Sequence, residues 1–75
     1  SDSEIAVVEA GTGREISPSD AALQAYLQVG RPRLSQIFNE LNRCGILAVR
    51  KQGRTRLFRI SDAARAYLTG NNLEG

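Results

Sequence analysis

The sequence predicts an α+β fold, in which a helical core is followed by a two-stranded hairpin and a last helix. Between residues 34 and 41, apolar side chains recur at steps of three and four, as they do on one face of a helix. After Gly45 the apolar side chains alternate on both sides of a polar segment, which is typical of a hairpin. Glycine, proline and serine residues separate these stretches and divide the chain into short elements.

The first element lies at residues 5–10, where Ile5-Ala6-Val7-Val8 favours a short helix and a strand is the alternative. Gly11 and Gly13 are expected to end it, and residues 14–16 should form a brief extended segment.

A second helix is expected to start at Ser17-Pro18-Ser19-Asp20. Ser17 can cap its first backbone N–H groups, Pro18 suits the first helical position, and Asp20 completes a capping box. The side chains expected to face the core are Ala22, Leu23, Tyr26 and Leu27.

Residues 28–30 interrupt the helical pattern, and a third helix is expected from about Arg31, because Pro32 is tolerated only near a helix start. Two helices joined by a three-residue turn form a helix-turn-helix unit. Cys44 should pack as a small apolar residue at the end of the third helix, and Gly45 should stop it. The expected core stripe is Leu34, Ile37, Phe38 and Leu41.

In the hairpin, one face is expected to carry Leu47, Val49, Phe58 and Ile60, and the other Arg50, Leu57 and Arg59. Keeping the apolar residues on one face requires an even loop, of two or four residues, within the tip 52–55. Ser61 should then cap a helix that runs to Thr69 and stops at Gly70. We expect its apolar residues Ala64, Tyr67 and Leu68 to pack on the domain's own core, which would leave a monomer or a weak dimer.

Charge is strongly segregated along the chain. Eight of the ten basic residues fall between Arg31 and Arg59, where the net charge is +7, whereas residues 1–30 carry −4. Positive charge confined to one region steers a polyanion toward that region, although the whole chain carries only +2.

Composition restricts the other functions. The length predicts one domain at residues 5–69, with flexible ends at 1–4 and 70–75. A single cysteine and no histidine leave no zinc site, no cofactor is expected, and no group of residues fits acid–base or nucleophilic catalysis, so we expect no enzyme. No apolar run approaches the roughly 20 residues that cross a bilayer, so we expect a cytoplasmic protein without a membrane partner.

The order of these elements, together with Leu27–Leu41, resembles the turn and recognition helix of bacterial winged helix-turn-helix transcriptional regulators. Gly45-Ile46-Leu47, Gly53-Arg54 and Phe58-Arg59-Ile60-Ser61 resemble their β-hairpin wing. The resemblance covers about residues 5–69 and is shared by the MarR-like, GntR-like and PadR-like groups. It implies a three-helix core with a wing and a short C-terminal helix. Gly30 departs from the pattern, because these families usually carry a serine there.

The spacing on the third helix predicts which residues would contact DNA. Steps of 100° place Gln36, Asn39 and Arg43 opposite the core stripe, flanked by Arg33 and Ser35. The amides can pair with adenine, and Arg33 with guanine. The resemblance implies that the recognition helix, at about residues 31–44, enters the major groove, and that the basic wing, at about residues 46–60, reaches the backbone or the minor groove. Phosphate contacts are expected from both ends of that helix and from the wing. The full predicted set is Arg31, Arg33, Ser35, Gln36, Asn39, Arg43, Arg50, Lys51, Gln52, Arg54, Thr55 and Arg56.

Three of the cations leave an alternative open, since Arg50, Lys51 and Arg59 can instead pair with Glu15 or Glu40. The function expected from the sequence is sequence-specific binding of double-stranded DNA, as a transcriptional regulator or as the DNA-binding module of a bacterial, phage or plasmid protein. The remainder of a longer chain and a second copy are further candidate partners. The alternatives are a winged helix that docks proteins and one that binds RNA.

Overall fold

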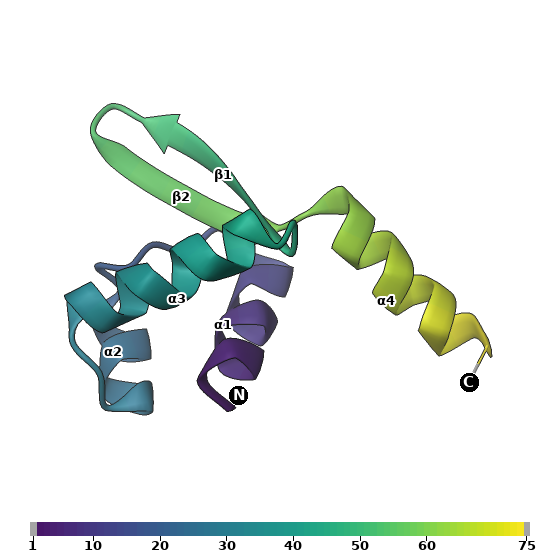
Figure 1. Ribbon diagram of the computed structural model, residues 1–75, viewed down its shortest axis with the longest axis horizontal. Coiled ribbons are helices and arrows are strands. Elements are labelled where there is room, and N and C mark those ends of the chain that lie inside the picture. Colours follow the sequence, from purple (N-terminus) through teal and green to yellow (C-terminus); the bar gives the residue numbers. More distant parts are fainter. Residues whose placement is uncertain (1, 75) are drawn as a thin grey trace.

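The computed structural model describes residues 2–74, and the side chains as far as Leu68. Figure 1 shows three helices grouped below a hairpin, with a fourth helix that projects away from them. This is the predicted α+β arrangement. The elements in order are α1 (Asp2–Gly13), α2 (Ala21–Leu27), α3 (Arg31–Arg43), β1 (Leu47–Gln52), β2 (Thr55–Ile60) and α4 (Asp62–Glu74).

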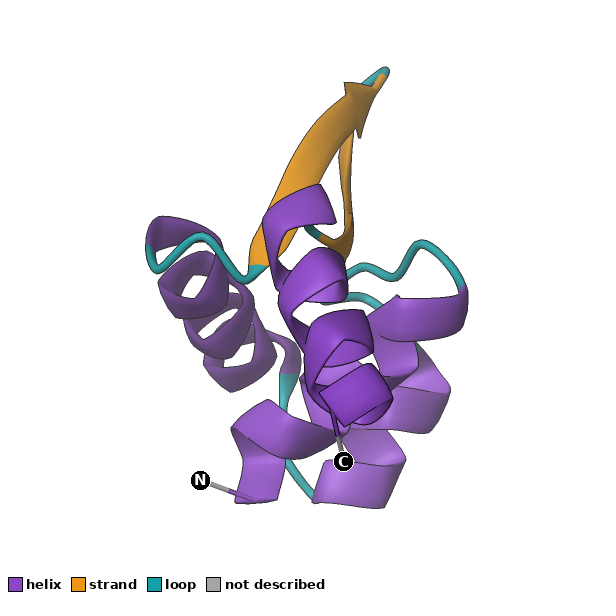
Figure 2. Ribbon diagram, turned by 90° about the vertical axis from the view of Figure 1, so that its right-hand side faces the viewer, coloured by secondary structure: helices purple, strands orange, loops and turns teal. Residues whose placement is uncertain are grey.

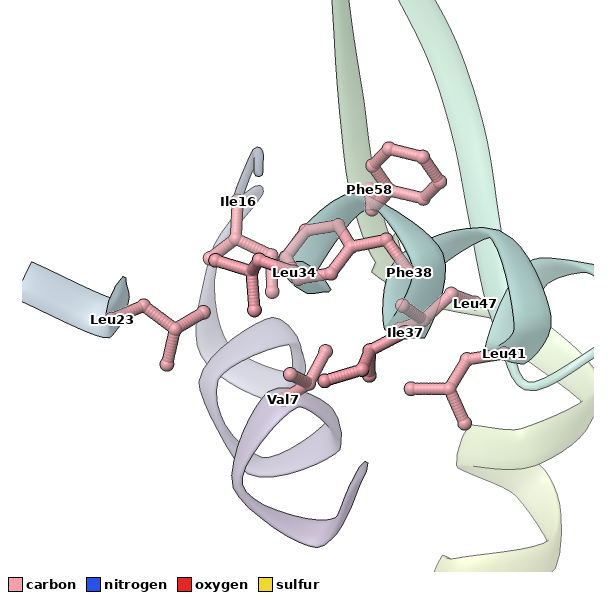
Figure 3. Close-up of a cluster of buried hydrophobic side chains, with 9 residues drawn as sticks. All are labelled: Val7, Ile16, Leu23, Leu34, Ile37, Phe38, Leu41, Leu47 and Phe58. Atoms are coloured by element: carbon pink, nitrogen blue, oxygen red, sulfur yellow. The ribbon is translucent and has the colours of Figure 1, made fainter. Parts of the chain in front are cut away.

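The core is built around α3, and its predicted apolar stripe is confirmed: all four residues are buried. Phe38 is fully buried and meets Phe58 of β2 edge to face, with ring centroids 4.9 Å apart and planes at 81°. Figure 3 shows Val7 of α1 and Leu23 of α2 directed at the same cluster from the other helices. Burial of these side chains removes apolar surface from water and holds the short elements together.

The hairpin has the predicted faces and an even loop. Leu47 pairs with Ile60 and Val49 with Phe58, so these four side chains share the face directed at the helices. The loop holds two residues, Gly53 and Arg54, between the pair of Gln52 and Thr55. Gly53 has a φ of 63°, as the first central position of a type II′ turn requires. The hairpin extends well beyond the helices (Figure 2).

The predicted extended segment before α2 is present and adds a third backbone to the sheet. The N–H of Ile16 donates to the carbonyl of Phe58 at 2.8 Å, and the N–H of Phe58 donates back to Ile16 at 2.7 Å. Ile16 itself is buried in the core. This bridge fixes the segment that leads to Ser17 alongside β2.

The first element ends at Gly13, as predicted, but the prediction that Gly11 interrupts it is wrong, and so is the alternative that this element is a strand. The helix α1 begins at Asp2 and includes both glycines. Gly11 is buried, and a Cβ at this position would lie 3.4 Å from both Ile16 and Leu47. Glycine therefore allows close packing against α1 here, and the intrahelical bonds continue past it.

The capping box at Ser17 is also wrong. The helix α2 starts at Ala21, and its cap is Asp20, whose Oδ1 accepts from the N–H of Leu23 at 3.0 Å. Ser17 instead closes a preceding turn, in which its carbonyl accepts from the N–H of Asp20 at 3.1 Å. Because α2 is only seven residues long, it buries Leu23 and partly buries Leu27, while Ala22 and Tyr26 of the predicted stripe stay exposed.

The last helix differs from the prediction in its length and its packing. Ser61 caps α4 as expected, since its Oγ accepts from the N–H of Ala64 at 3.1 Å. The helix continues through Gly70 to Glu74, because one glycine costs a helix about 1 kcal/mol and does not by itself end it. Tyr67 and Leu68 are exposed, so the reason for expecting a monomer is wrong. The prediction that residues 70–75 form a flexible tail concerns side chains outside the part that the structure describes.

Cys44 is exposed at the end of α3, where the sequence predicted a packed position. The chain turns at Gly45, which has a φ of 80°, and the next residue, Ile46, packs against the core instead. In the described part of the chain, no helix is long and apolar enough to cross a membrane.

Replacing Phe38 by alanine should cost about 3–5 kcal/mol, because it removes a ring that is fully buried between α3 and the hairpin. Since the single core of so short a chain rarely supplies more than about 3–5 kcal/mol of net stability, the variant should be largely unfolded at 37 °C. Chemical denaturation followed by circular dichroism measures this. Tyr26→Ala is the control, as its side chain is exposed and its loss should change stability by about 0.5 kcal/mol or less. Equal stability of the two variants would contradict the described core.

Candidate nucleic-acid interface

The outer face of α3 carries polar side chains at helical spacing. Arg33, Gln36, Glu40 and Arg43 follow one another at steps of three and four, and all are exposed. Arg33 donates to Oε1 of Gln36 at 3.4 Å, and Arg43 forms an ion pair with Glu40 at 3.3 Å. The amide nitrogen of Gln36 keeps its two protons for an outside partner.

A second line of side chains runs along α3 on the side of the hairpin. Arg31, Ser35 and Asn39 are spaced by four residues, so they lie on one flank of the helix. Arg31 is exposed, whereas Ser35 and Asn39 are half-buried. Gly30 caps the helix without a side-chain hydrogen bond, so the first N–H groups of α3 are not occupied by a cap.

The hairpin places its cations on different faces. Arg56 lies on the same face as Phe58, and its guanidinium carbon is 5.2 Å from the centroid of that ring. Lys51 is its cross-strand neighbour. Arg54 occupies the turn, and Gln52 and Thr55 flank it with exposed side chains. The contact with Phe58 directs Arg56 toward α3 rather than into open solvent.

A cleft of about 340 Å³ separates the wing from α3 and from the turn before α2. Phe58 lies at its base, and each of the three surrounding segments contributes polar side chains. The lining side chains are Ser17, Pro18, Ser19, Arg31, Ser35, Arg54, Thr55, Arg56 and Phe58. Ser17 and Ser19 were not among the predicted contacts, because in sequence a Ser-Pro-Ser-Asp segment is indistinguishable from an ordinary helix cap.

Arg50 lies on the opposite face of the sheet, in a bidentate ion pair. Its Nε and Nη2 donate to the two carboxylate oxygens of Glu15 at 2.6 and 2.7 Å, and Nη2 also donates to Gln52 at 3.1 Å. These hydrogen bonds hold the pKa of Glu15 below its ordinary value and raise the pKa of Arg50. The alternative that Arg50 pairs with Glu15 is therefore confirmed. The ion pair connects β1 to the segment that leads into α2.

The ion pairs divide the arginines into two groups. Four arginines contact a carboxylate among the described residues: Arg14 with Asp20, Arg43 with Glu40, Arg50 with Glu15, and Arg59 with Asp62. The three that line the cleft, Arg31, Arg54 and Arg56, have no carboxylate partner in the part of the chain that the structure describes. Arg33 and Arg65 also lack a described carboxylate partner, so three of the five arginines without one surround this polar cleft.

Comparison with solved structures finds the same arrangement of elements elsewhere. The chain superimposes on Rv0081 from Mycobacterium tuberculosis with a TM-score of 0.77 and 23% identity, covering 99% of this chain and 73% of that one. Reduced HlyU from Vibrio cholerae superimposes with a TM-score of 0.73 and 21% sequence identity, covering 92% of this chain and 72% of HlyU. The adhesin competence repressor AdcR from Streptococcus pyogenes superimposes with a TM-score of 0.75 and 13% sequence identity, covering 99% of this chain and 56% of AdcR. No protein-family model and no curated protein sequence matches the chain. At these identities the likeness shows a shared fold.

The ion pair of Glu15 and Arg50 should make stability depend on pH in the acid range. A carboxylate whose folded-state pKa is lowered stabilises the fold above its unfolded pKa, about 4.3 for glutamate, and this contribution is lost as the pH falls through the lower folded-state value. Wild type should therefore melt at a higher temperature than Glu15→Gln at pH 6, and the difference should shrink by pH 3. Thermal melts across this range measure it. Asp62→Asn, which removes a longer and more exposed ion pair, should show a smaller difference. A gap between wild type and Glu15→Gln that stays constant with pH would contradict the expectation.

Proposed function

We propose that this chain, which has the winged helix-turn-helix fold, binds double-stranded DNA as part of a transcriptional regulator. In this proposal α3 enters the major groove and the wing contacts the sugar–phosphate backbone. The observation that carries it is the convergence of Arg31, Arg54 and Arg56 on the cleft beside α3, none of them paired with a described carboxylate. The exposed Gln36 lies on the neighbouring outer face of the same helix. That one of the structures sharing the fold is named a repressor supports the same function.

Base recognition is proposed for the outer face of α3 and for the adjoining flank that carries the half-buried Asn39. Gln36 and Asn39 are one turn apart, and an amide can pair with adenine through two hydrogen bonds. Arg33 precedes them and suits guanine, because its guanidinium can donate to O6 and N7 together. It has no described carboxylate partner and is held only by a long bond to Gln36, which base contact can replace.

Backbone contact is proposed for the cations around the cleft and for the rest of the wing. Arg31, Arg54 and Arg56 are the strongest phosphate ligands, since binding them to DNA breaks no ion pair with a described carboxylate. Arg43 would have to break its ion pair with Glu40 before it could contact a phosphate, and Arg50 would have to break its ion pair with Glu15. The remaining polar positions in the proposed interface are Ser35, Lys51, Gln52 and Thr55.

Charge on the rest of the surface supports this orientation. Residues 1–30, which include α1 and α2, carry a net −4, and the region from Arg31 to Arg59 carries +7. A duplex is therefore attracted to the side with α3 and the wing, and the acidic helix α1 is repelled from it, whereas α2 itself carries no charged side chain. A protein-docking wing has no need of such an excess of unpaired arginine, whereas a basic wing could also follow an RNA backbone. Competition between duplex DNA and structured RNA at equal salt tests that distinction.

Gln36→Ala or Asn39→Ala should reduce affinity for the preferred duplex by about 1–3 kcal/mol, because each removes a bidentate amide–base contact. Binding to random duplex should change little, since phosphate contacts stay in place. Selection from a duplex library gives the preferred site, and isotherms on that site and on random DNA give the two affinities. Equal losses on both would remove these residues from the proposed base contacts.

The salt dependence of binding tests the backbone contacts. Each phosphate neutralised releases a counterion, so log affinity should fall with log salt by about 0.9 per contact, or about 3.6 for Arg31, Arg43, Arg54 and Arg56 together. Arg54→Ala and Arg56→Ala should each reduce the slope by nearly one unit and weaken binding to all sequences alike.

Arg59→Ala is the matched control, because Arg59 belongs to the same hairpin but is paired with Asp62 and lies outside the cleft. Its slope should equal that of wild type. If wild type had no measurable affinity for duplex DNA at low salt, the proposed function would be wrong. An unchanged slope for both wing variants, with wild-type binding intact, would instead exclude the wing from the backbone contact.

A further inference from the structure

We propose that the cleft between the wing and the turn before α2 holds a single phosphate group of the bound backbone, and that Ser17 and Ser19 are ligands to it. This inference rests on the proposed function and adds a third segment to the interface. Neither serine was predicted to contact DNA from the sequence, where both belong to an apparent helix start. In the structure neither serine caps α2, because Asp20 is its cap.

The hydroxyls of Ser17 and Ser19 form a pair suited to an anion. Their Oγ atoms are 2.7 Å apart, so one hydroxyl donates to the other and the second proton is left to donate elsewhere. Ser17 Oγ also accepts from the N–H of Ser19 at 3.3 Å, which holds its position. Both side chains line the cleft together with three arginines. A phosphate oxygen accepts several hydrogen bonds at once, and this arrangement supplies donors from opposite sides.

The cleft has the size and the direction that a backbone phosphate needs. Its volume of about 340 Å³ leaves room for a phosphate group. Arg31 and Ser35, which form its wall on α3, continue along the helix into Asn39. A phosphate in the cleft would thus sit directly beside the helix that reads the bases.

Arg56 is positioned for the same group. The ring of Phe58 lies beneath its guanidinium at 5.2 Å, and Phe58 is fixed by the backbone bridge to Ile16, one residue before Ser17. Phe58 therefore connects Arg56 on the wing, through its ring, to the turn that carries the serines, through its backbone hydrogen bonds with Ile16. We infer that they bind a common phosphate rather than two separate ones.

The test compares duplex binding by wild type and by the double variant Ser17→Ala/Ser19→Ala. The variant should bind every duplex about tenfold more weakly, because hydrogen bonds to a charged phosphate are lost. Its salt slope should stay that of wild type, since a neutral hydroxyl releases no counterion. Its melting temperature should be close to that of wild type, because Asp20 still caps α2. Thr12→Ala is the control, as it removes an exposed hydroxyl on α1.

A double-mutant cycle tests whether one phosphate is shared. Combining Ser17→Ala/Ser19→Ala with Arg56→Ala should cost less than the sum of the separate losses, because residues that hold one group are coupled. Combining the serine changes with Arg43→Ala, at the other end of α3, should be additive. Unchanged affinity in the serine variant would overturn the inference and leave the proposed function standing. Additivity with Arg56, or a salt slope reduced by a full unit in the serine variant, would also overturn it. Absence of wild-type duplex binding would instead overturn the proposed function itself.

Discussion

The edge-to-face contact between Phe38 and Phe58 is the interaction on which the proposed interface depends. Phe38 belongs to α3 and Phe58 to β2, so their 4.9 Å separation sets the position of the wing relative to the helix. Phe58 also holds the segment before α2 through its backbone and supports Arg56 with its ring. One buried aromatic thus links three chain segments that are remote in sequence and that meet around the cleft.

The ion pairs assign different tasks to chemically identical residues. Arg50 and Arg56 are both exposed arginines of the hairpin, yet they lie on opposite faces of the sheet. Arg50 is held by Glu15 and stabilises the base of the wing, whereas Arg56 has no carboxylate partner in the described chain and is left for an anion. Both interactions are electrostatic and weaken with salt, but only the second is exchanged for a phosphate on binding.

So small a domain tolerates this concentration of unpaired charge because its core contains no charged group among the described residues. Stability comes from apolar burial around α3, and the arginines of the cleft lie outside that core. They repel one another across solvent, where the cost is small. Substitutions at the cleft can therefore change affinity without unfolding the domain, and this separation makes the proposed contacts measurable one at a time.

The sequence by itself determined the elements that have a strong period, namely the α3 stripe, the two faces of the hairpin and its even loop, because each depends on spacing between neighbours. Of the cations predicted to contact DNA, the structure brings Arg31, Arg54 and Arg56 to one cleft. Prediction from the sequence failed at Gly11, at Ser17 and at Tyr67. Gly11 stays helical and packs near Ile16 and Leu47, the nearby Asp20 caps α2 in place of Ser17, and Tyr67 is exposed. Only the tertiary structure decided which arginines are paired and that two serines line the cleft. The cleft and the ion pair of Glu15 with Arg50 join residues far apart in sequence, and no local pattern encodes their distances. The other ion pairs of the described chain are local, as in Arg43 with Glu40.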